Sequence, residues 1–243
     1  SYSKGKEIAE AVARELGYEC IARKVLLEAS DEFDIPELKL IRAIHDAPSL
    51  LDRLSVGKKK YIAFIRKEIL DHFKKDNVVY HGLAGHFFVS GISHVIKVRV
   101  IADMGERVRL EMEREGISKE KAQQIIEKDD EERRKWSLAL YNVDTRNSGN
   151  YDMVLHINKL TRNDAVDIIC RAARLQQFQA TEKSRRAIED LALAAHAEAK
   201  LLELTPDLQV YAEQGKVFVK TEVPVFLREK LTRDMVQSVS AIP

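Results

Sequence analysis

The chain has 243 residues, of which 45% are hydrophobic and 33% are charged. Its 40 Lys and Arg residues nearly balance its 39 Asp and Glu residues, so the overall charge does not favour nucleic acid or an anionic membrane as a partner. The charged fraction exceeds the roughly one quarter that is typical of soluble domains and predicts long solvated helices in a soluble protein.

The two cysteines, Cys20 and Cys170, have no paired spacing with each other or with histidines. This pattern predicts neither a disulfide nor a zinc site, and we expect free thiols in a reducing compartment. No segment approaches the roughly 18 apolar residues of a transmembrane helix, and the first residues lack a signal-peptide pattern. We therefore expect a cytoplasmic protein without a transmembrane segment.

The first motif is Lys4-Gly5-Lys6, which leads into a helical pattern with Ile8, Val12 and Leu16 on one face. Amides at a helix start lack carbonyl partners and carry the positive end of the helix dipole, so this turn suits a phosphate group. A complete P-loop also needs an earlier glycine and a preceding strand, which would lie before Ser1. A charged helix N-terminus without a ligand is the alternative.

The chain then alternates between short β-branched runs and longer helical patterns. Strands are predicted at residues 18–21, 78–80 and 95–102, and helices at 24–33 and 58–75. Residues 81–86 contain two glycines and predict a loop after the second strand.

Two long charged helices follow at residues 106–113 and 119–140, separated by Gly116, with Ser118 as the cap of the second. A strand at 151–157 and a helix at 161–174 complete the region. Strands separated by helices of this length predict a parallel α/β sheet with crossover connections.

The pattern changes after about residue 175. Polar residues 176–186 predict a linker, and a helix over 187–204 precedes two strands at 208–212 and 216–223 and a final helix after Pro224. We therefore expect two domains, one over residues 1–175 and a small α+β domain over residues 187–243.

The order of motifs over about residues 1–174 resembles the cytidylate kinase-like family of P-loop nucleoside monophosphate kinases. The residues that carry the resemblance are Lys4-Gly5-Lys6-Glu7-Ile8-Ala9, the stretch 54–66, Arg107 after the third strand, Lys128-x-Asp130-x-x-Arg133, and Asn150-Tyr151-Asp152 to Lys159-Leu160. The resemblance implies a parallel-sheet kinase-like domain with a helical lid, whose first strand would precede Ser1.

The resemblance also implies ATP-dependent phosphoryl transfer to a nucleoside monophosphate, with CMP as the family default and Mg²⁺ bound with ATP. It implies that Ser3, Lys4 and Gly5 hold phosphates, that Lys6 reaches the transferred group, and that Arg107 and Arg133 form a cationic clamp. Asp130 would orient the lid, and Arg66 and Gly82 would lie near the acceptor. No protein metal site is predicted.

Two positions depart from the expected patterns. Glu7 follows the lysine where P-loop proteins carry the Ser or Thr that binds magnesium. The resemblance to cytidylate kinase-like proteins includes this glutamate and implies that metal binding uses water or another carboxylate. Leu83 follows Gly82 where an arginine would bind the acceptor phosphate. His81 and His86 lie on either side of this position, either as phosphate ligands when protonated or as packing residues. Leu83 favours an alternative function, a nucleotide-binding regulator that has lost turnover.

The charged side chains of the two long helices also allow a purely structural interpretation. Arg107, Asp130 and Arg133 could form ordinary ion pairs on solvated helices, without a ligand.

The C-terminal domain resembles a known small module. Residues 208–219 and 239–243, with Val223, resemble a BON domain, which implies a protein or lipid partner and a last strand beyond Pro243. The surface pattern gives no basic stripe or aromatic belt for a membrane. A non-catalytic scaffold acting through this domain is a third possible function, and the sequence gives no oligomeric state.

Overall fold

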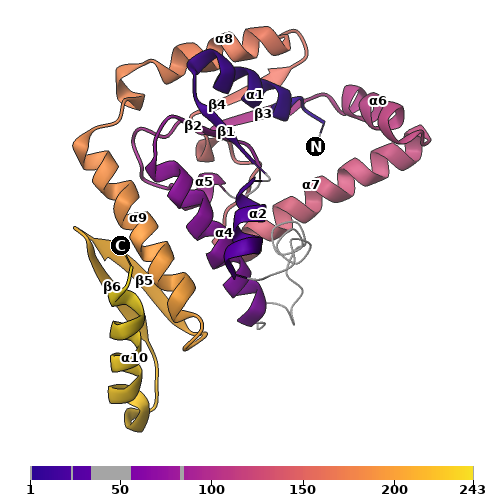
Figure 1. Ribbon diagram of the computed structural model, residues 1–243. Coiled ribbons are helices and arrows are strands. Elements are labelled where there is room, and N and C mark those ends of the chain that lie inside the picture. Colours follow the sequence, from indigo (N-terminus) through magenta and orange to yellow (C-terminus); the bar gives the residue numbers. More distant parts are fainter. Residues whose placement is uncertain (1, 23, 34–55, 83–84, 243) are drawn as a thin grey trace.

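The computed structural model describes residues 2–22, 24–33, 56–82 and 85–242, and it alternates helices with short strands (Figure 1). The predicted helices and strands are confirmed in type, but Gly85 and His86 of the predicted loop lie in a short helix, and residues 182–186 of the predicted linker are helical as well. The first part of the chain forms α1 (Gly5–Leu16), β1 (Glu19–Ile21), α2 (Lys24–Phe33), α4 (Val56–Lys74), β2 (Val78–Tyr80) and the short α5 (Gly85–Phe88). The next part forms β3 (Val98–Ala102), α6 (Met104–Glu115), α7 (Lys119–Tyr141), β4 (Met153–Ile157) and α8 (Arg162–Ala173).

Local capping sets several helix boundaries. Ser118 accepts a hydrogen bond from the amide of Lys121 and so starts α7, as the sequence predicts. Thr161 and Asp164 cap one another reciprocally at the start of α8. Gly17 and Gly116 end α1 and α6 in the left-handed conformation, which is why glycine occupies both positions.

The strands pair in parallel, as predicted, but they form two separate pairs. Glu19 to Ile21 of β1 lie opposite Val78 to Tyr80 of β2. Val98 to Ala102 of β3 lie opposite Met153 to Ile157 of β4. The sequence pattern predicts one sheet. Among the described strands, β2 and β3 do not pair, and residues of both line one cavity.

Two apolar cores hold the strand pairs. The larger core contains Ile21, Ile65, Ile69, Trp136 and Ile188, and so joins β1 to α4, α7 and α9. The second core lies where α1 and α8 pack against β3 and β4, with Ile8, Val12, Leu155, Ala165 and Ile169. Burial of such side chains contributes about 1.5–3 kcal/mol each.

Helices α6 and α7 form an arm that extends to one side of the strands (Figure 1). Val108, Ala122 and Ile126 make a small core inside this arm, and Tyr2 packs against it. The predicted helical lid therefore corresponds to a pair of antiparallel helices with its own apolar contact.

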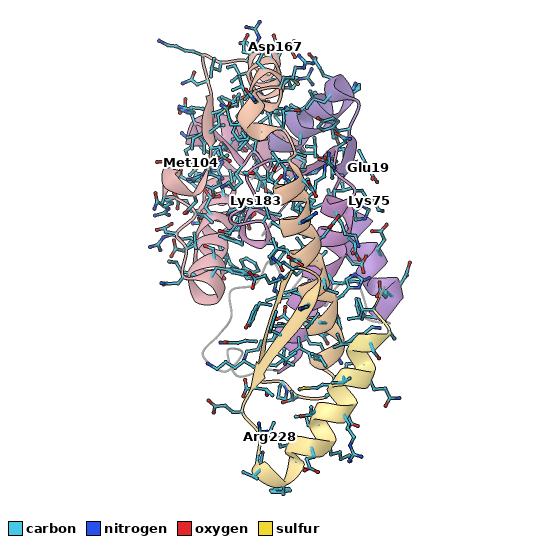
Figure 2. The ribbon with its side chains drawn as sticks, turned by 90° about the vertical axis from the view of Figure 1, so that its left-hand side faces the viewer. Glu19, Lys75, Met104, Asp167, Lys183 and Arg228 are labelled. Atoms are coloured by element: carbon cyan, nitrogen blue, oxygen red, sulfur yellow. The ribbon has the colours of Figure 1, made fainter. Side chains whose placement is uncertain are left out.

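The C-terminal residues form α9 (Glu182–Leu201), β5 (Leu208–Glu213), β6 (Lys216–Thr221) and α10 (Arg228–Ser240). The two strands are an antiparallel hairpin, so the expected order of helix, hairpin and helix is confirmed. Met235 of α10 packs with Ala197 and Leu201 of α9 in a separate core. Figure 2 shows Asp167 of α8 and Arg228 of α10 at opposite ends of the molecule.

Helix α9 begins earlier than predicted and belongs to both parts of the molecule. Thr181 and Ser184 cap its start, so residues 182–186, which the sequence assigns to a linker, are helical. Ile188, Ala192 and Ala195 of α9 lie in the larger core with residues of α4. Within the described residues, no helix is long and apolar enough to cross a membrane.

Candidate functional site

The N-terminus of α1 is open to a ligand. Lys4 precedes the helix in the left-handed conformation, with φ 61° and ψ 16°, and its side chain makes no capping hydrogen bond. Its carbonyl accepts the first helical hydrogen bond from the amide of Ile8, at 3.0 Å. The amides of Gly5, Lys6 and Glu7 therefore have no hydrogen-bond acceptor within the helix. They lie at the positive end of the helix dipole.

Both lysines of the motif have carboxylate neighbours, but their contacts are long. The Nζ atom of Lys4 lies 3.7 Å from Oε1 of Glu106, and that of Lys6 lies 3.8 Å from Oε1 of Glu10. All four side chains are more than a third exposed. Exposed pairs of this kind contribute little to stability, so an anion can replace these carboxylates at low cost.

A cavity of about 1060 Å³ opens beside this helix start. Ser3, Lys4, Gly5 and Lys6 line it on one side, and His81 and Gly82 line it at the carboxyl end of β2. The arm contributes Arg114 and Arg133. The structure thus brings together six predicted residues from three parts of the chain: Ser3, Lys4, Gly5, Lys6, Gly82 and Arg133.

Arg107 and Asp130 do not line the cavity but bind one another across the arm. Arg107 donates two hydrogen bonds to the carboxylate of Asp130, each 2.8 Å long, and so joins α6 to α7. Burial acts to raise the pKa of Asp130, but the hydrogen bonds and charge of Arg107 outweigh it and hold this pKa below its ordinary value. The pair therefore fixes the arm that presents Arg133.

Tyr2 attaches the segment before α1 to the same arm. Its ring lies under the guanidinium of Arg114, 4.8 Å from the ring centre, and its hydroxyl is hydrogen-bonded to Glu111. Burial and this hydrogen bond raise the pKa of Tyr2 to about 12. Glu111 is itself buried on α6 and lies 3.6 Å from Arg114. The sequence pattern singles out none of these three residues.

Arg66 lies elsewhere. Its guanidinium donates a 2.8 Å hydrogen bond to Glu198 of α9, and it does not line the cavity. The structure places Arg66 in the contact between α4 and α9, because α9 packs along the helix that carries Arg66. Its expected place near an acceptor stays a prediction. Leu83, at the expected position of an acceptor-binding arginine, lies outside the described residues.

The two histidines that flank this position are held in the neutral form. Burial lowers the pKa of His81, and burial with the charge of Lys97 lowers that of His86 to about 4. The rings of His86 and Phe87 lie 3.9 Å apart. Packing therefore describes His86 better than phosphate binding, because a neutral imidazole offers no charge to an anion.

The described residues contain no group of three or more His, Cys, Asp or Glu side chains placed to hold a metal ion. Glu7 lines the cavity beside Lys6. Phosphate-bound Mg²⁺ usually keeps several waters and takes one or two carboxylates from the protein. Asp76 and Asp129 line other parts of the same cavity, and Glu7 beside Lys6 is consistent with a metal ion that arrives with a nucleotide.

Residues 1–159 match the cytidylate kinase-like family, and since this is more than half of its length the chain belongs to that family. Membership in this family favours nucleotide binding and a kinase-like function. No curated protein matches the chain. A crystal structure of an uncharacterized protein from Eubacterium ventriosum matches with a TM-score of 0.52 and 19% identity, over 71% of this chain and 92% of the other. At that identity the match shows a similar fold alone.

Proposed function

We propose that this protein transfers a phosphoryl group from ATP to a nucleoside monophosphate, with CMP as the family default. The observation that carries the proposal is the cavity that joins Lys4-Gly5-Lys6 at the start of α1 to Arg133 of the arm. Family membership supports the same reaction class. Phosphoryl transfer depends mainly on positioning and on neutralising charge, and lysine, arginine and free backbone amides supply both.

In this proposal each part of the site has one task. The amides of Gly5 and Lys6 bind phosphate oxygens, and Lys6 neutralises charge on the transferred group. Arg133 contacts the phosphates from the arm, and its planar guanidinium can bind two oxygens at once. Arg107 and Asp130 act as positioning residues, because they bind one another and keep α6 against α7.

The site also fits Mg²⁺ that is bound to ATP. Glu7 is the carboxylate that would hold this ion, directly or through water, since it lines the cavity next to Lys6. The metal ion would supply further neutralisation of phosphate charge. On the acceptor side, His81 and Gly82 lie at the end of β2 and offer backbone groups and a neutral imidazole.

The first test is binding. ATP with Mg²⁺ should raise the melting temperature of the wild-type protein by several degrees, since saturation at about 100 times Kd stabilises the folded state by about 2.7 kcal/mol. Lys6→Ala should lose most of this shift. Lys183→Ala, which removes an exposed lysine at the start of α9, should keep it. An equal shift in wild type and Lys6→Ala would contradict the proposed phosphate site.

The second test is turnover. ADP formation is measured with CMP, UMP, AMP and GMP as acceptors, and one pyrimidine monophosphate should give clear turnover. Arg133→Ala should lower kcat by at least about tenfold, because it removes charge that stabilises the transition state. ATP binding without turnover on any acceptor would reject the enzyme and favour the nucleotide-binding regulator. The BON-like identity of the C-terminal unit stays a separate proposal, supported by its helix, hairpin and helix order.

A further inference from the structure

Helix α4 carries ionisable side chains into the protein interior. Lys67 is 8% exposed, Glu68 is 7% exposed and His72 is 3% exposed. Charged side chains are rarely buried without partners, because loss of hydration costs several kcal/mol for each ion. The partners here come from two other helices, α2 and α9.

On one side these residues bind α2. The ammonium group of Lys67 donates to Glu32 of α2 and, at 2.8 Å, to Glu68. The carboxyl groups of Glu32 and Glu68 therefore meet at one ammonium group. A hydrogen bond between them requires that one of them carries a proton, because an ionised carboxylate can only accept. Nε2 of His72 lies 2.5 Å from Glu28 of α2.

On the other side the network reaches α9. Lys67 lies 3.4 Å from Oδ2 of Asp71, and the same oxygen lies 2.7 Å from Nε2 of His196. Helix α9 in turn binds the hairpin, because the carboxylate of Asp190 accepts hydrogen bonds from the amides of Gln214 and Gly215. The ionic contacts are therefore continuous from α2 through α4 to α9.

Carboxyl groups outnumber the permanent cations in this network. Glu19 of β1 lies 3.9 Å from Nδ1 of His72, and Lys74 lies 3.8 Å from Asp71. The carboxyl groups are Glu19, Glu28, Glu32, Glu68 and Asp71, and they face Lys67, Lys74 and the imidazoles of His72 and His196. Glu68 is the one buried carboxyl group among these five, and the excess negative charge around it favours retention of a proton there.

Glu68 is the more buried carboxyl group of the pair, at 7% exposed, whereas the Glu32 side chain is 45% exposed. Burial, assisted by the hydrogen bond with Glu32, raises the pKa of Glu68 to about 7 despite the opposing charge of Lys67. The hydrogen bonds of Glu32 with Glu68 and Lys67 outweigh burial and lower its pKa. We therefore assign the proton to Glu68.

We propose that this network is a proton-operated attachment of α2, in which the proton shared by Glu32 and Glu68 holds α2 on α4 and the loss of this proton at higher pH loosens α2. Without the proton, two carboxylates face one another beside a single ammonium group. The apolar contacts of α2, which include Ala29 and the stacked rings of Phe33 and Phe64, keep the helix from leaving entirely.

The position of α2 connects this attachment to the cavity. Helix α2 follows β1 closely, and the carbonyl of Ile21 at the end of β1 accepts a hydrogen bond from the amide of His81, at 3.2 Å. His81 lines the cavity. Loosening of α2 therefore changes the surroundings of His81 at the edge of the cavity. The proton-dependent attachment does not require the proposed phosphoryl transfer.

The test is amide hydrogen exchange of the whole chain at pH 6 and pH 8, expressed as protection factors so that the intrinsic pH dependence is removed. Proton linkage at a group that titrates near pH 7 predicts that the opening equilibrium of α2 rises about tenfold between these values. Protection of α8 should not change. Glu68→Gln should remove the pH dependence, because a glutamine amide donates to Glu32 at both pH values.

Glu32→Gln is the second variant and should remove the pH dependence in the same way, so the test survives if Glu68→Gln does not fold. Glu182→Gln, in an exposed pair with Arg186, is the matched control and should behave as wild type. The inference is overturned if α2 protection is the same at both pH values, if α8 loosens to the same extent, or if both variants keep the tenfold change.

Discussion

Arg107 and Asp130 form a two-pronged ion pair between α6 and α7, with both hydrogen bonds at 2.8 Å. The Arg107 side chain is only 12% exposed, so water screens the pair weakly. Arg107, which the resemblance assigns to a cationic clamp, and Asp130, which it assigns to the orientation of the lid, thus hold the arm together.

Loss of this pair should destabilise the arm. Arg107→Ala leaves Asp130 half-buried without its main partner, and we expect the free energy of unfolding to fall by about 1–3 kcal/mol. Urea denaturation measures this change. Glu113→Gln, which removes one carboxylate from an exposed contact with Arg109, is the control and should change stability by less than about 0.5 kcal/mol.

The pair also predicts a pH dependence in acid. The pKa of Asp130 is lower in the folded state than its ordinary value, so its stabilising effect is present above about pH 4 and is lost as the pH falls below that value. Asp130→Asn should therefore reduce the loss of stability between about pH 4 and pH 2. Identical acid profiles for the variant and wild type would show that the pair has no linked proton.

Glycine is required at Gly85 by a neighbouring ring. A Cβ atom there would lie 2.5 Å from Cδ1 and 2.6 Å from Cε1 of Tyr80. Gly85→Ala should cost about 1–3 kcal/mol, because a buried ring must move. Gly105→Ala is the comparison, since nothing lies within 4 Å of its Cβ position in α6. Gly105→Ala should stabilise the protein by up to about 1 kcal/mol. In thermal unfolding, we therefore expect a lower melting temperature for Gly85→Ala and a higher one for Gly105→Ala.

Arg66 and Glu198 provide a test of how α9 is attached. A double-mutant cycle with Arg66→Ala and Glu198→Ala should give a coupling energy of about 1 kcal/mol, because both side chains are largely buried. The same cycle at the exposed contact between Lys59 and Asp207 should give a coupling energy close to zero. If Arg66→Ala instead weakens nucleotide binding and leaves stability unchanged, Arg66 belongs to the acceptor site as the sequence predicts.

The phenol of Tyr2 should lose its proton at a higher pH than an ordinary tyrosine, and its hydrogen bond should stabilise the N-terminal segment. Its phenol has a pKa of about 12, so the folded state keeps this proton above pH 10 and loses stability relative to the unfolded chain as the pH rises further. Tyr2→Phe should cost about 1 kcal/mol, since Glu111 loses a hydrogen bond. Ultraviolet absorbance of phenolate in wild type and variant identifies the titration, and Tyr211→Phe on the hairpin is an exposed control.

Local patterns predicted most of the fold. Ser118 and Thr161 each cap a helix by accepting a hydrogen bond from the backbone amide three positions later. Such short-range contacts can be predicted from the sequence. The motif Lys4-Gly5-Lys6 likewise marks the start of α1 and one wall of the cavity.

Contacts between distant residues could not be predicted in this way. Arg66 and Glu198 are separated by 132 positions, and each sits in a helix whose charges look solvated in the sequence. Only the packing of α9 against α4 makes them partners. Tyr2 and Glu111 are a similar case, because nothing in the local pattern relates the first residues to α6.

The cavity beside the two strand pairs has a consequence for what this protein can bind. Each of β2 and β3 pairs with one strand among the described strands, and residues of both line the cavity. The edge of a paired strand can accept a further extended chain, which adds its own backbone donors and acceptors. We expect an added apolar strand peptide to bind at this place, and fluorescence anisotropy of the labelled peptide measures the binding.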